Sequence, residues 1–472
     1  METINNIFNA IGSFIWGPPL LIFLVGVHIF LTFRLKFIQR YIPKAIKLSL
    51  QKDAEANGDI SHFGALAIAL AATIGTGNII GVATAIVSGG PGAVFWCWLC
   101  GMFGIATKYG EAVLAIKYRT IDKNGIICGG PMYALEYGLK NKFLAIMFAI
   151  FTLLACTGIG SMAQSNAVAS FTNEVFGVPT FTTGLLEAVL IMAVIMGGVK
   201  IVSKVCGTLV PVMAIMYVVC CICIAVVNHA TVVPAIKLII SSAFSFESIK
   251  GGFFGSMVML AMRYGISRGL FSNESGMGSA PLIAASAKTI NPVRQALISS
   301  TGTFWDTVVI CALTGIVMVS SVLKLDPQAN FFKYNAIELP KIAFANIPYI
   351  GHYCLAVALI IFAYTTILGW FCYGRQAIFY LAGHKTFIAF KWAFVVLTFL
   401  GAVIKLDLVW CISDIANGLM AIPNLISLVA LSGIIVFETR RYLWCNQLDL
   451  VDEECANINE KGRVASPNEM EK

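Results

Sequence analysis

Residues 60–92 form an apolar run long enough to cross a membrane, but glycine and polar residues interrupt it at its middle. The interruption reads Thr-Ile-Gly-Thr-Gly-Asn over residues 73–78. A glycine lowers helix stability by about 1 kcal/mol relative to alanine, so we expect the helix to unwind here. Unwound backbone at membrane depth is tolerated only where it lines a cavity or is buried in protein. Its free carbonyl groups attract a cation and the new helix N-terminus attracts an anion, which predicts part of a site for a small zwitterion.

The rest of the chain has the composition of a polytopic membrane protein. Hydrophobic residues make up 58% and charged residues 12% of it, about half the charged fraction of a soluble domain. The cysteines lie mostly within apolar segments and the five histidines are scattered, so we expect no metal cluster and no cofactor. The excess of basic residues is explained by cytoplasmic loops, and no nucleic-acid partner is expected.

Apolar segments predict eleven transmembrane helices. They lie at about residues 14–33, 63–87, 92–116, 143–169, 180–199, 206–227, 252–287, 295–320, 351–380, 388–404 and 414–437. Most basic loop residues fall on one side of the membrane if this count is correct. The positive-inside rule then places the N-terminus outside and the C-terminus in the cytoplasm. Residues 441–472 are predicted to form a cytoplasmic tail.

The seventh expected span is also interrupted, by a polar run at residues 263–280. The second and seventh spans are five positions apart in the order of spans, an odd number, so they cross the membrane in opposite directions. Two interrupted spans at matching positions of oppositely oriented halves are the sequence sign of an inverted-repeat transporter. We therefore predict repeats at residues 61–230 and 248–440, preceded by one helix and a basic loop at residues 1–60. The alternative for the first break alone is a glycine-containing helix that packs closely against a neighbour.

Charged side chains within the spans cost roughly 2.5–3.5 kcal/mol each on insertion scales, so each needs a partner. Glu111, near one end of the third span, is expected to reach the headgroups or to pair with a nearby lysine. Arg263, Arg268 and Glu274 flank the second break, where an ion pair could be structural or could gate the cavity. Asp306 is interpreted as a structural hydrogen-bonding residue in preference to a proton carrier.

Other polar and aromatic residues in the spans allow two interpretations each. Gln164 could donate to a substrate carboxylate or could join two helices. Thr366 and Trp370 lie four residues apart on one helical face, where Trp370 could wall a pocket or simply pack. Thr365 and Thr366 offer hydroxyl oxygens suited to a hard cation such as sodium.

Seven segments together resemble one transporter family. They are TIGTGNIIGVATAI (73–86), GGPGAVFW (89–96), GGPMYALEYGL (129–139), RGLFSNESGMGSAP (268–281), FWDT (304–307), FAYTTILGW (362–370) and NGLMAIPNLISL (417–428). The chain is similar to the alanine or glycine:cation symporter family, the sodium:alanine symporters of bacteria and archaea. The resemblance implies an all-α polytopic protein of the cytoplasmic membrane. It further implies a leucine-transporter-like fold, a five-plus-five inverted repeat with one extra N-terminal helix.

The same resemblance implies import of small neutral amino acids, alanine or glycine, coupled to sodium by alternating access. The implied substrate-binding residues are Gly75, Thr76, Gly77, Asn78, Gln164, Phe271, Ser272, Asn273, Met277, Thr366 and Trp370. The implied sodium-binding residues are Thr73, Asn78, Thr365 and Thr366. Ser161 stands where the family is expected to carry asparagine, which leaves the substrate range open.

Several alternatives remain at this stage. The same fold could carry another small amino acid, such as serine, or could couple transport to protons. An intramembrane enzyme would need a nucleophile with a base at depth, and Ser272 near Glu274 is the one loose candidate, with no His or Lys beside it. A channel is the remaining rival. The expected partners are a small amino acid, sodium and the lipid bilayer, and a monomer is expected although the sequence leaves the oligomeric state open.

Overall fold

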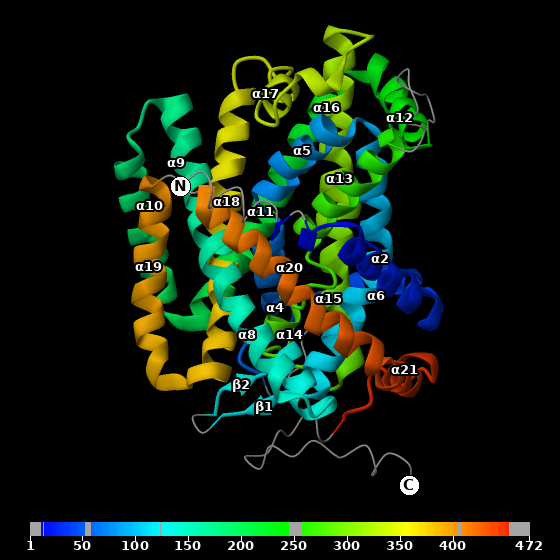
Figure 1. Cartoon of the computed structure of the whole chain (residues 1–472), viewed down its shortest axis with the longest axis vertical. Helices are drawn as coiled ribbons and strands as arrows, with labels where there is room; N and C mark the ends of the chain where they lie inside the picture. Colours follow the sequence, from blue (N-terminus) through cyan, green and yellow to red (C-terminus); the bar gives the residue numbers. More distant parts are fainter. Residues whose placement is uncertain are drawn as a thin grey trace.

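The structure, a computed structural model, is almost entirely helical (Figure 1). It describes residues 11–12, 14–51, 58–122, 125–244, 256–404 and 407–452. Within these residues, seven helical segments are long and apolar enough to cross a membrane, which makes the chain a multi-pass membrane protein. They are α6 (Gly92–Lys117), α8–α9 (Lys142–Phe176), α11 (Gly198–Val227), α15–α16 (Pro292–Leu325), α18 (Gly351–Ala382), α19 with the turn before it (His384–Val403) and the Ile412–Ala430 part of α20.

Two further pairs of helices pass the same test together but are bent at a break. One pair is Pro18–Arg34 with Ile38–Ser49, bent by 65°, and the other is His62–Thr73 with Thr76–Gly89, bent by 58°. Each of the eleven expected spans overlaps a helix or an interrupted helix, whereas the apolar helix α12 (His229–Phe244) was not expected.

The remaining elements follow in chain order. The helices are α2 (Pro18–Arg34), α3 (Ile42–Ser49), α4 (His62–Thr73), α5 (Ile80–Gly89), α7 (Pro131–Tyr133), α8 (Lys142–Thr157), α9 (Ala163–Phe176), α10 (Thr180–Ile195), α13 (Ser256–Asn273), α14 (Pro281–Ala284), α15 (Pro292–Thr303), α16 (Ala312–Leu325), α17 (Glu338–Phe344), α19 (Phe387–Val403), α20 (Asp407–Ala430) and α21 (Ser432–Thr439). Short 3-10 or π-helical turns are η1 (Ile38–Tyr41), η2 (Thr76–Asn78), η3 (Ala134–Gly138), η4 (Gly158–Met162), η5 (Phe304–Cys311), η6 (Phe331–Lys333), η7 (His384–Thr386) and η8 (Arg440–Trp444). Strands β1 (Thr120–Ile121) and β2 (Ile127–Cys128) form an antiparallel hairpin in which Thr120 faces Cys128.

The molecule has two distinguishable ends (Figure 1). Helices α12 and α17 lie at one end, and the β1–β2 hairpin and α21 lie at the other. We call these the α17 end and the hairpin end. Helices α10 and α19 pack side by side along one flank.

Helix α6 is buried along most of its length and packs against α13 and α15. The first broken helix changes partners at its break, because α4 contacts α11 and α18 whereas α5 contacts α13. Two π-helical stretches, η4 and η5, lie within the α8–α9 and α15–α16 segments. Such stretches in long helices often mark functional positions, and both contribute residues to the site described next.

Candidate functional site

The first break follows the prediction from its glycines. Helix α4 ends at Thr73, Ile74 and Gly75 have extended backbone, and α5 begins at Ile80. The Asn78 side chain stabilises the unwound turn, because its Oδ1 accepts a hydrogen bond from the Gly75 amide at 2.8 Å. The expected loss of helical hydrogen bonding near the middle of this span is therefore confirmed.

The second break begins later than expected. The polar run at residues 263–280 predicts an interruption over its whole length, but α13 continues through Asn273 and regular helix resumes only at Pro281. Between them, Glu274, Gly276 and Gly278 have positive φ angles of 55°, 90° and 80°. Glycine adopts this left-handed conformation without steric cost, so the two glycines set where the chain unwinds.

The two breaks lie against each other. A Cβ added to Gly77 would lie 3.5 Å from Phe271 Cδ1 and 3.8 Å from Ser272 Cα. Asp306, in η5, forms hydrogen bonds to residues at both breaks. Its carboxylate accepts hydrogen bonds from Asn78 Nδ2 at 2.6 Å and from Ser272 Oγ at 2.9 Å. Thr307 Oγ1 also donates to it at 2.6 Å, so one buried carboxylate holds both broken helices, in agreement with the structural role expected for Asp306.

A small cavity lies where the breaks meet. Its lining comes from α4, η2, η4, α9, α13, the segment after α13, α18 and α20. The lining residues are Ala72, Thr73, Gly75, Gly77, Ile159, Gln164, Phe271, Glu274, Thr366, Trp370 and Asn417. The space open to the centre of a water molecule is about 20 Å³, which is room for roughly one water. The cavity must therefore widen before it can hold an amino acid.

The structure brings part of the sequence-predicted set together. Gly75, Gly77, Gln164, Phe271, Thr366 and Trp370 line the cavity, as does Thr73 from the predicted ion-binding set. Thr76, Asn78, Ser272, Asn273, Met277 and Thr365 are absent from the described lining. Thr76 is adjacent, because its hydroxyl donates to Gln164 Oε1 at 3.0 Å. Asn273 Nδ2 donates to Thr307 Oγ1 at 3.0 Å and Met277 is fully buried.

The two threonines of α18 differ in direction. Thr366 Oγ1 donates to the Ala71 carbonyl of α4 at 3.0 Å, and a Cβ on Gly75 would lie 2.6 Å from it. Thr365 Oγ1 instead donates to the carbonyls of Ile361 and Phe362 in its own helix, at 3.0 Å each. Only Thr366 therefore presents its hydroxyl to the first break.

Sequence reasoning assigned no substrate or ion role to two polar cavity residues, and it misplaced Glu111, which lies outside the cavity. Asn417 stands in a quoted motif but received no role. Glu274 was considered as an ion-pair partner of an arginine and as a neighbour of Ser272 in the enzyme alternative. Among the described residues, no salt bridge contains Glu274. Glu111 does not reach the headgroups, since it is buried and its Oε1 accepts from the amides of Gly276 and Gly278 at 2.9 and 3.0 Å. No local sequence signal links Glu111 to these amides.

A second, wider pocket of about 250 Å³ lies toward the α17 end. It is lined by Thr76, Ile80, Asn166, Ala167, Val168, Ser170, Phe171, Glu174, Ile337, Pro340, Leu355 and Leu359. Thr76 borders this pocket and Gln164 borders the central cavity, so the hydrogen bond between them stands between the two spaces.

Toward the hairpin end, main-chain hydrogen bonds close the gap between the residues before α4 and those after α14. Ile60 pairs with Ala287 as a parallel β-bridge, and the Lys288 amide donates to the Ile60 carbonyl at 2.8 Å. Asp59 reinforces this closure, since its amide donates to the Ser286 carbonyl at 2.9 Å. Its carboxylate lies 3.5 Å from Arg375. Burial raises the pKa of the Asp59 carboxyl, and the Arg375 cation opposes that rise.

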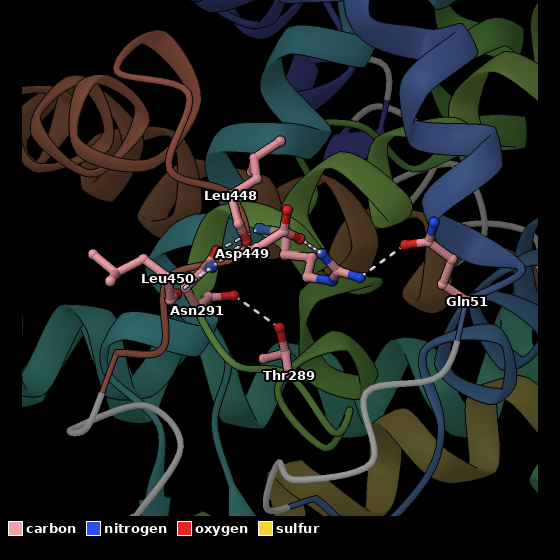
Figure 2. Close-up of polar contacts among 7 residues, drawn as sticks. Gln51, Thr289, Asn291, Leu448, Asp449 and Leu450 are labelled. Atoms are coloured by element: carbon pink, nitrogen blue, oxygen red, sulfur yellow. Dashed lines mark hydrogen bonds and ion pairs between the residues drawn. The ribbon is translucent and has the colours of Figure 1, made fainter.

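Hydrogen bonds attach the segment after η8 to the same end of the molecule (Figure 2). Asn291 Nδ2 donates to the Leu448 and Leu450 carbonyls at 2.8 and 3.1 Å. Arg294 donates to Asp449 Oδ1 at 2.7 Å and to Gln51 Oε1 at 2.9 Å. Three parts of the chain thus meet at one place: residues before the first break, residues after the second break and the end of the described chain.

These features can be compared with known proteins. The sequence model of the sodium:alanine symporter family matches residues 1–455. The chain belongs to this family. It is therefore a symporter and not an enzyme.

Individual relatives agree with this assignment. The sodium/alanine symporter AgcS of Methanococcus maripaludis is 48% identical over 444 residues, covering 93% of this chain and 97% of that protein. The probable sodium/glutamine symporter GlnT of Bacillus subtilis is 33% identical over 447 residues, covering 93% and 91%. Among solved structures, the Eremococcus coleocola manganese transporter is similar in fold, with a TM-score of 0.52 at 14% identity over 82% of this chain and 83% of that chain.

Proposed function

We propose that this symporter imports small neutral amino acids, alanine or glycine, together with sodium by alternating access. The observation that carries the proposal is the small cavity between the two broken helices. Backbone from the first break and side chains from α9, α13 and α18 converge there. Discontinuous helices that meet at one site are the usual way in which such transporters bind a small substrate and its coupling ion.

The proposed architecture is a leucine-transporter-like fold with eleven spans. Residues 61–230 and 248–440 form two inverted repeats, residues 1–60 add one helix and a loop, and residues 441–472 form the tail. The bend of 58° in the first repeat and the positive-φ segment after α13 in the second support this arrangement. The basic loops favour a cytoplasmic hairpin end, with the N-terminus outside the cytoplasmic membrane and the C-terminus inside. The proposed functional unit is a monomer.

The proposed substrate position follows from the charges of the broken ends. The substrate carboxylate faces the N-terminal end of η2 and α5, where free amides and the helix dipole favour an anion. Trp370 and Phe271 limit the size of the side chain. Trp370 is held in place from behind, because a Cβ on Gly160 would lie 2.5 Å from Trp370 Cβ. Small side chains are therefore preferred on steric grounds.

The proposed sodium position lies at the C-terminal end of α4. Thr366 Oγ1 and the Ala71 carbonyl already lie 3.0 Å apart there, and Thr73 lines the same cavity. Hydroxyl and carbonyl oxygens are the ligands that a hard cation prefers, and the helix C-terminus adds a negative partial charge. Thr365 and Asn78 join this set only if their side chains turn away from their present hydrogen bonds.

In the proposed cycle, the α17 end opens first and admits sodium and substrate. Opening requires the Thr76–Gln164 hydrogen bond to break, since it separates the outer pocket from the cavity. The Ile60–Ala287 bridge then separates to release both toward the hairpin end. The membrane potential favours import, because each elementary charge that crosses 100 mV contributes about 2.3 kcal/mol.

Uptake of labelled alanine into proteoliposomes tests the proposal. We expect uptake under an inward sodium gradient, with competition by unlabelled glycine and alanine. If uptake is equal when sodium is absent and a proton gradient is imposed, the coupling ion is the proton and not sodium. If unlabelled glutamine or serine competes with labelled alanine better than unlabelled alanine and glycine do, the preferred substrate is that other amino acid.

A further inference from the structure

Two buried side chains with acceptor oxygens line the central cavity. Asn417, on α20, is only 2% exposed, and its Oδ1 has no hydrogen-bond partner in the described part of the chain. Glu274 is 3% exposed and lines the same cavity. Its Oε2 accepts a hydrogen bond from the Ser279 hydroxyl, which leaves most of the acceptor capacity of the carboxylate for other donors. A donor that enters the cavity can therefore bind the unpaired Asn417 oxygen and the Glu274 carboxylate.

The other polar groups of the cavity are already engaged. Gln164 Oε1 accepts from Thr76 at 3.0 Å, and Gln164 Nε2 donates to the Ile159 carbonyl at 3.3 Å. Thr366 donates to a carbonyl of α4. Among the described lining residues, Glu274 and Asn417 are thus the side chains with the most acceptor capacity left for a ligand.

The local charge points the same way. The Lys108 ammonium lies within electrostatic range of Glu274, Glu111 and Asp306. Among the described residues, these three buried carboxylates therefore share one buried cation. Asp306 accepts from three side-chain donors. Glu111 accepts from two backbone amides and from Asn424 Nδ2. Glu274 has the fewest donors of the three and faces the cavity, which makes it the carboxylate most in need of a further positive group.

We propose that Glu274 and Asn417 form the subsite for the ammonium group of the substrate. The inference rests on the proposed function, since it assumes that a small zwitterion enters this cavity. A primary ammonium has three donors and no acceptor, which suits one carboxylate and one amide oxygen. The substrate then lies across the cavity, with its carboxylate at η2 and its ammonium toward α20 and the unwound segment after α13. The subsite requires a positively charged amino group and excludes carboxylic acids that lack one.

Equilibrium binding to the purified full-length chain in sodium buffer tests the subsite. The probes are L-alanine and L-lactate, which has the same carbon skeleton with a hydroxyl in place of the ammonium. We expect the wild type to bind alanine and to discriminate strongly against lactate. Glu274→Gln should weaken alanine binding by at least about 30-fold, which corresponds to the lower limit of about 2 kcal/mol for an unpaired buried charge. Asn417→Ala, a second and independent variant, should also weaken alanine binding.

Two matched variants separate ligand binding from a structural role. Ser275→Ala removes a buried hydroxyl from the same unwound segment, where Ser275 contacts Thr303 and not the cavity, and should leave alanine binding unchanged. Ser279→Ala removes the internal donor to Glu274. If Ser279→Ala weakens alanine binding as much as Glu274→Gln does, Glu274 shapes the turn and the inference is overturned. If Glu274→Gln shifts only the sodium dependence and leaves alanine affinity at saturating sodium intact, Glu274 is a cation ligand and the inference is again overturned.

The same measurements distinguish failure of the subsite from failure of the proposed function. Equal binding of alanine and lactate by the wild type would remove the subsite and leave amino-acid transport standing. Binding of a different zwitterion, lost in Glu274→Gln, would replace alanine as substrate and keep the subsite. If no compound with an ammonium group binds, both proposals fail.

Discussion

Replacing Asp306 with asparagine tests whether one buried carboxylate holds the two broken helices together. Asparagine keeps the shape of the side chain but puts an amide NH₂ in place of one carboxylate oxygen. The oxygens of Asp306 now accept from Asn78, Ser272 and Thr307. In Asp306→Asn, only one oxygen acceptor remains. Ser272 and Thr307 keep a hydrogen bond only if their hydroxyls turn to accept from the new NH₂ group, and none of the three bonds keeps a charged acceptor.

The expected loss of stability can be worked out from these three bonds. Side-chain hydrogen bonds in membrane proteins contribute about 0.6 kcal/mol on average and at most about 1.7 kcal/mol, so weakening all three costs up to about 2–5 kcal/mol. The negative charge of the acceptor favours the upper part of this range, because hydrogen bonds to charged groups are stronger. Transport should fall more steeply than stability, since Asn78 and Ser272 belong to the two segments that form the cavity.

Unfolding of the purified protein and uptake by equal amounts of reconstituted protein measure the two effects. Thr307→Val removes one of the three donors and should cost about a third as much stability as Asp306→Asn. Thr84→Val is the matched control, because Thr84 Oγ1 donates only to the Ile80 carbonyl of its own helix at 2.7 Å. Wild-type unfolding and uptake in Asp306→Asn would refute the role of Asp306 as the shared anchor.

Three further changes have defined outcomes. Trp370→Ala should widen the range of accepted side chains, measured by competition against alanine uptake, and unchanged selectivity would remove Trp370 from the cavity wall. Gly160→Ala should press Trp370 into the cavity, since the added Cβ would lie 2.5 Å from Trp370 Cβ, and should lower uptake of alanine relative to glycine; an unaltered ratio counts against this packing. Asp449→Ala should cost less than about 1 kcal/mol because the Asp449 side chain is 94% exposed. Arg294→Ala also loses the bond to Gln51 and should make residues 447–452 more susceptible to proteolysis, whereas equal protection in both variants would show that Arg294 does not fasten this segment.

The sequence predicted what depends on local propensity. The paired glycines around Thr76 located the first break correctly, because glycine weakens a helix and unwound backbone at membrane depth must line a cavity or be buried in protein. The second break was predicted too early, since Ser272 and Asn273 are polar but remain helical. Their side chains reach Asp306 and Thr307, partners more than thirty residues away that propensity does not record.

Long-range contacts explain the other differences. Glu111 has lysines nearby in sequence, and these suggested a surface role. In the structure, its Oε1 instead accepts hydrogen bonds from two backbone amides of the second break. Asn417 reaches the cavity only because α20 packs against α8 beside η4. Trp370 and Gln164 could be predicted as candidates, but the choice between packing and a pocket wall required the position of both breaks. The ligand roles of all of these residues remain predictions.

The bridge between Ile60 and Ala287 has a consequence for how this carrier can be tuned. Peptide groups make its hydrogen bonds, so among single replacements only proline, which lacks an amide hydrogen, deletes one of them directly. In the proposed cycle, release toward the hairpin end would therefore be insensitive to most point mutations at the bridge itself. Gly58 is a second sensitive position, since an added Cβ would lie 2.3 Å from the Lys288 nitrogen. In the proposed cycle, a side chain at that glycine would alter the release step although it touches neither substrate nor ion.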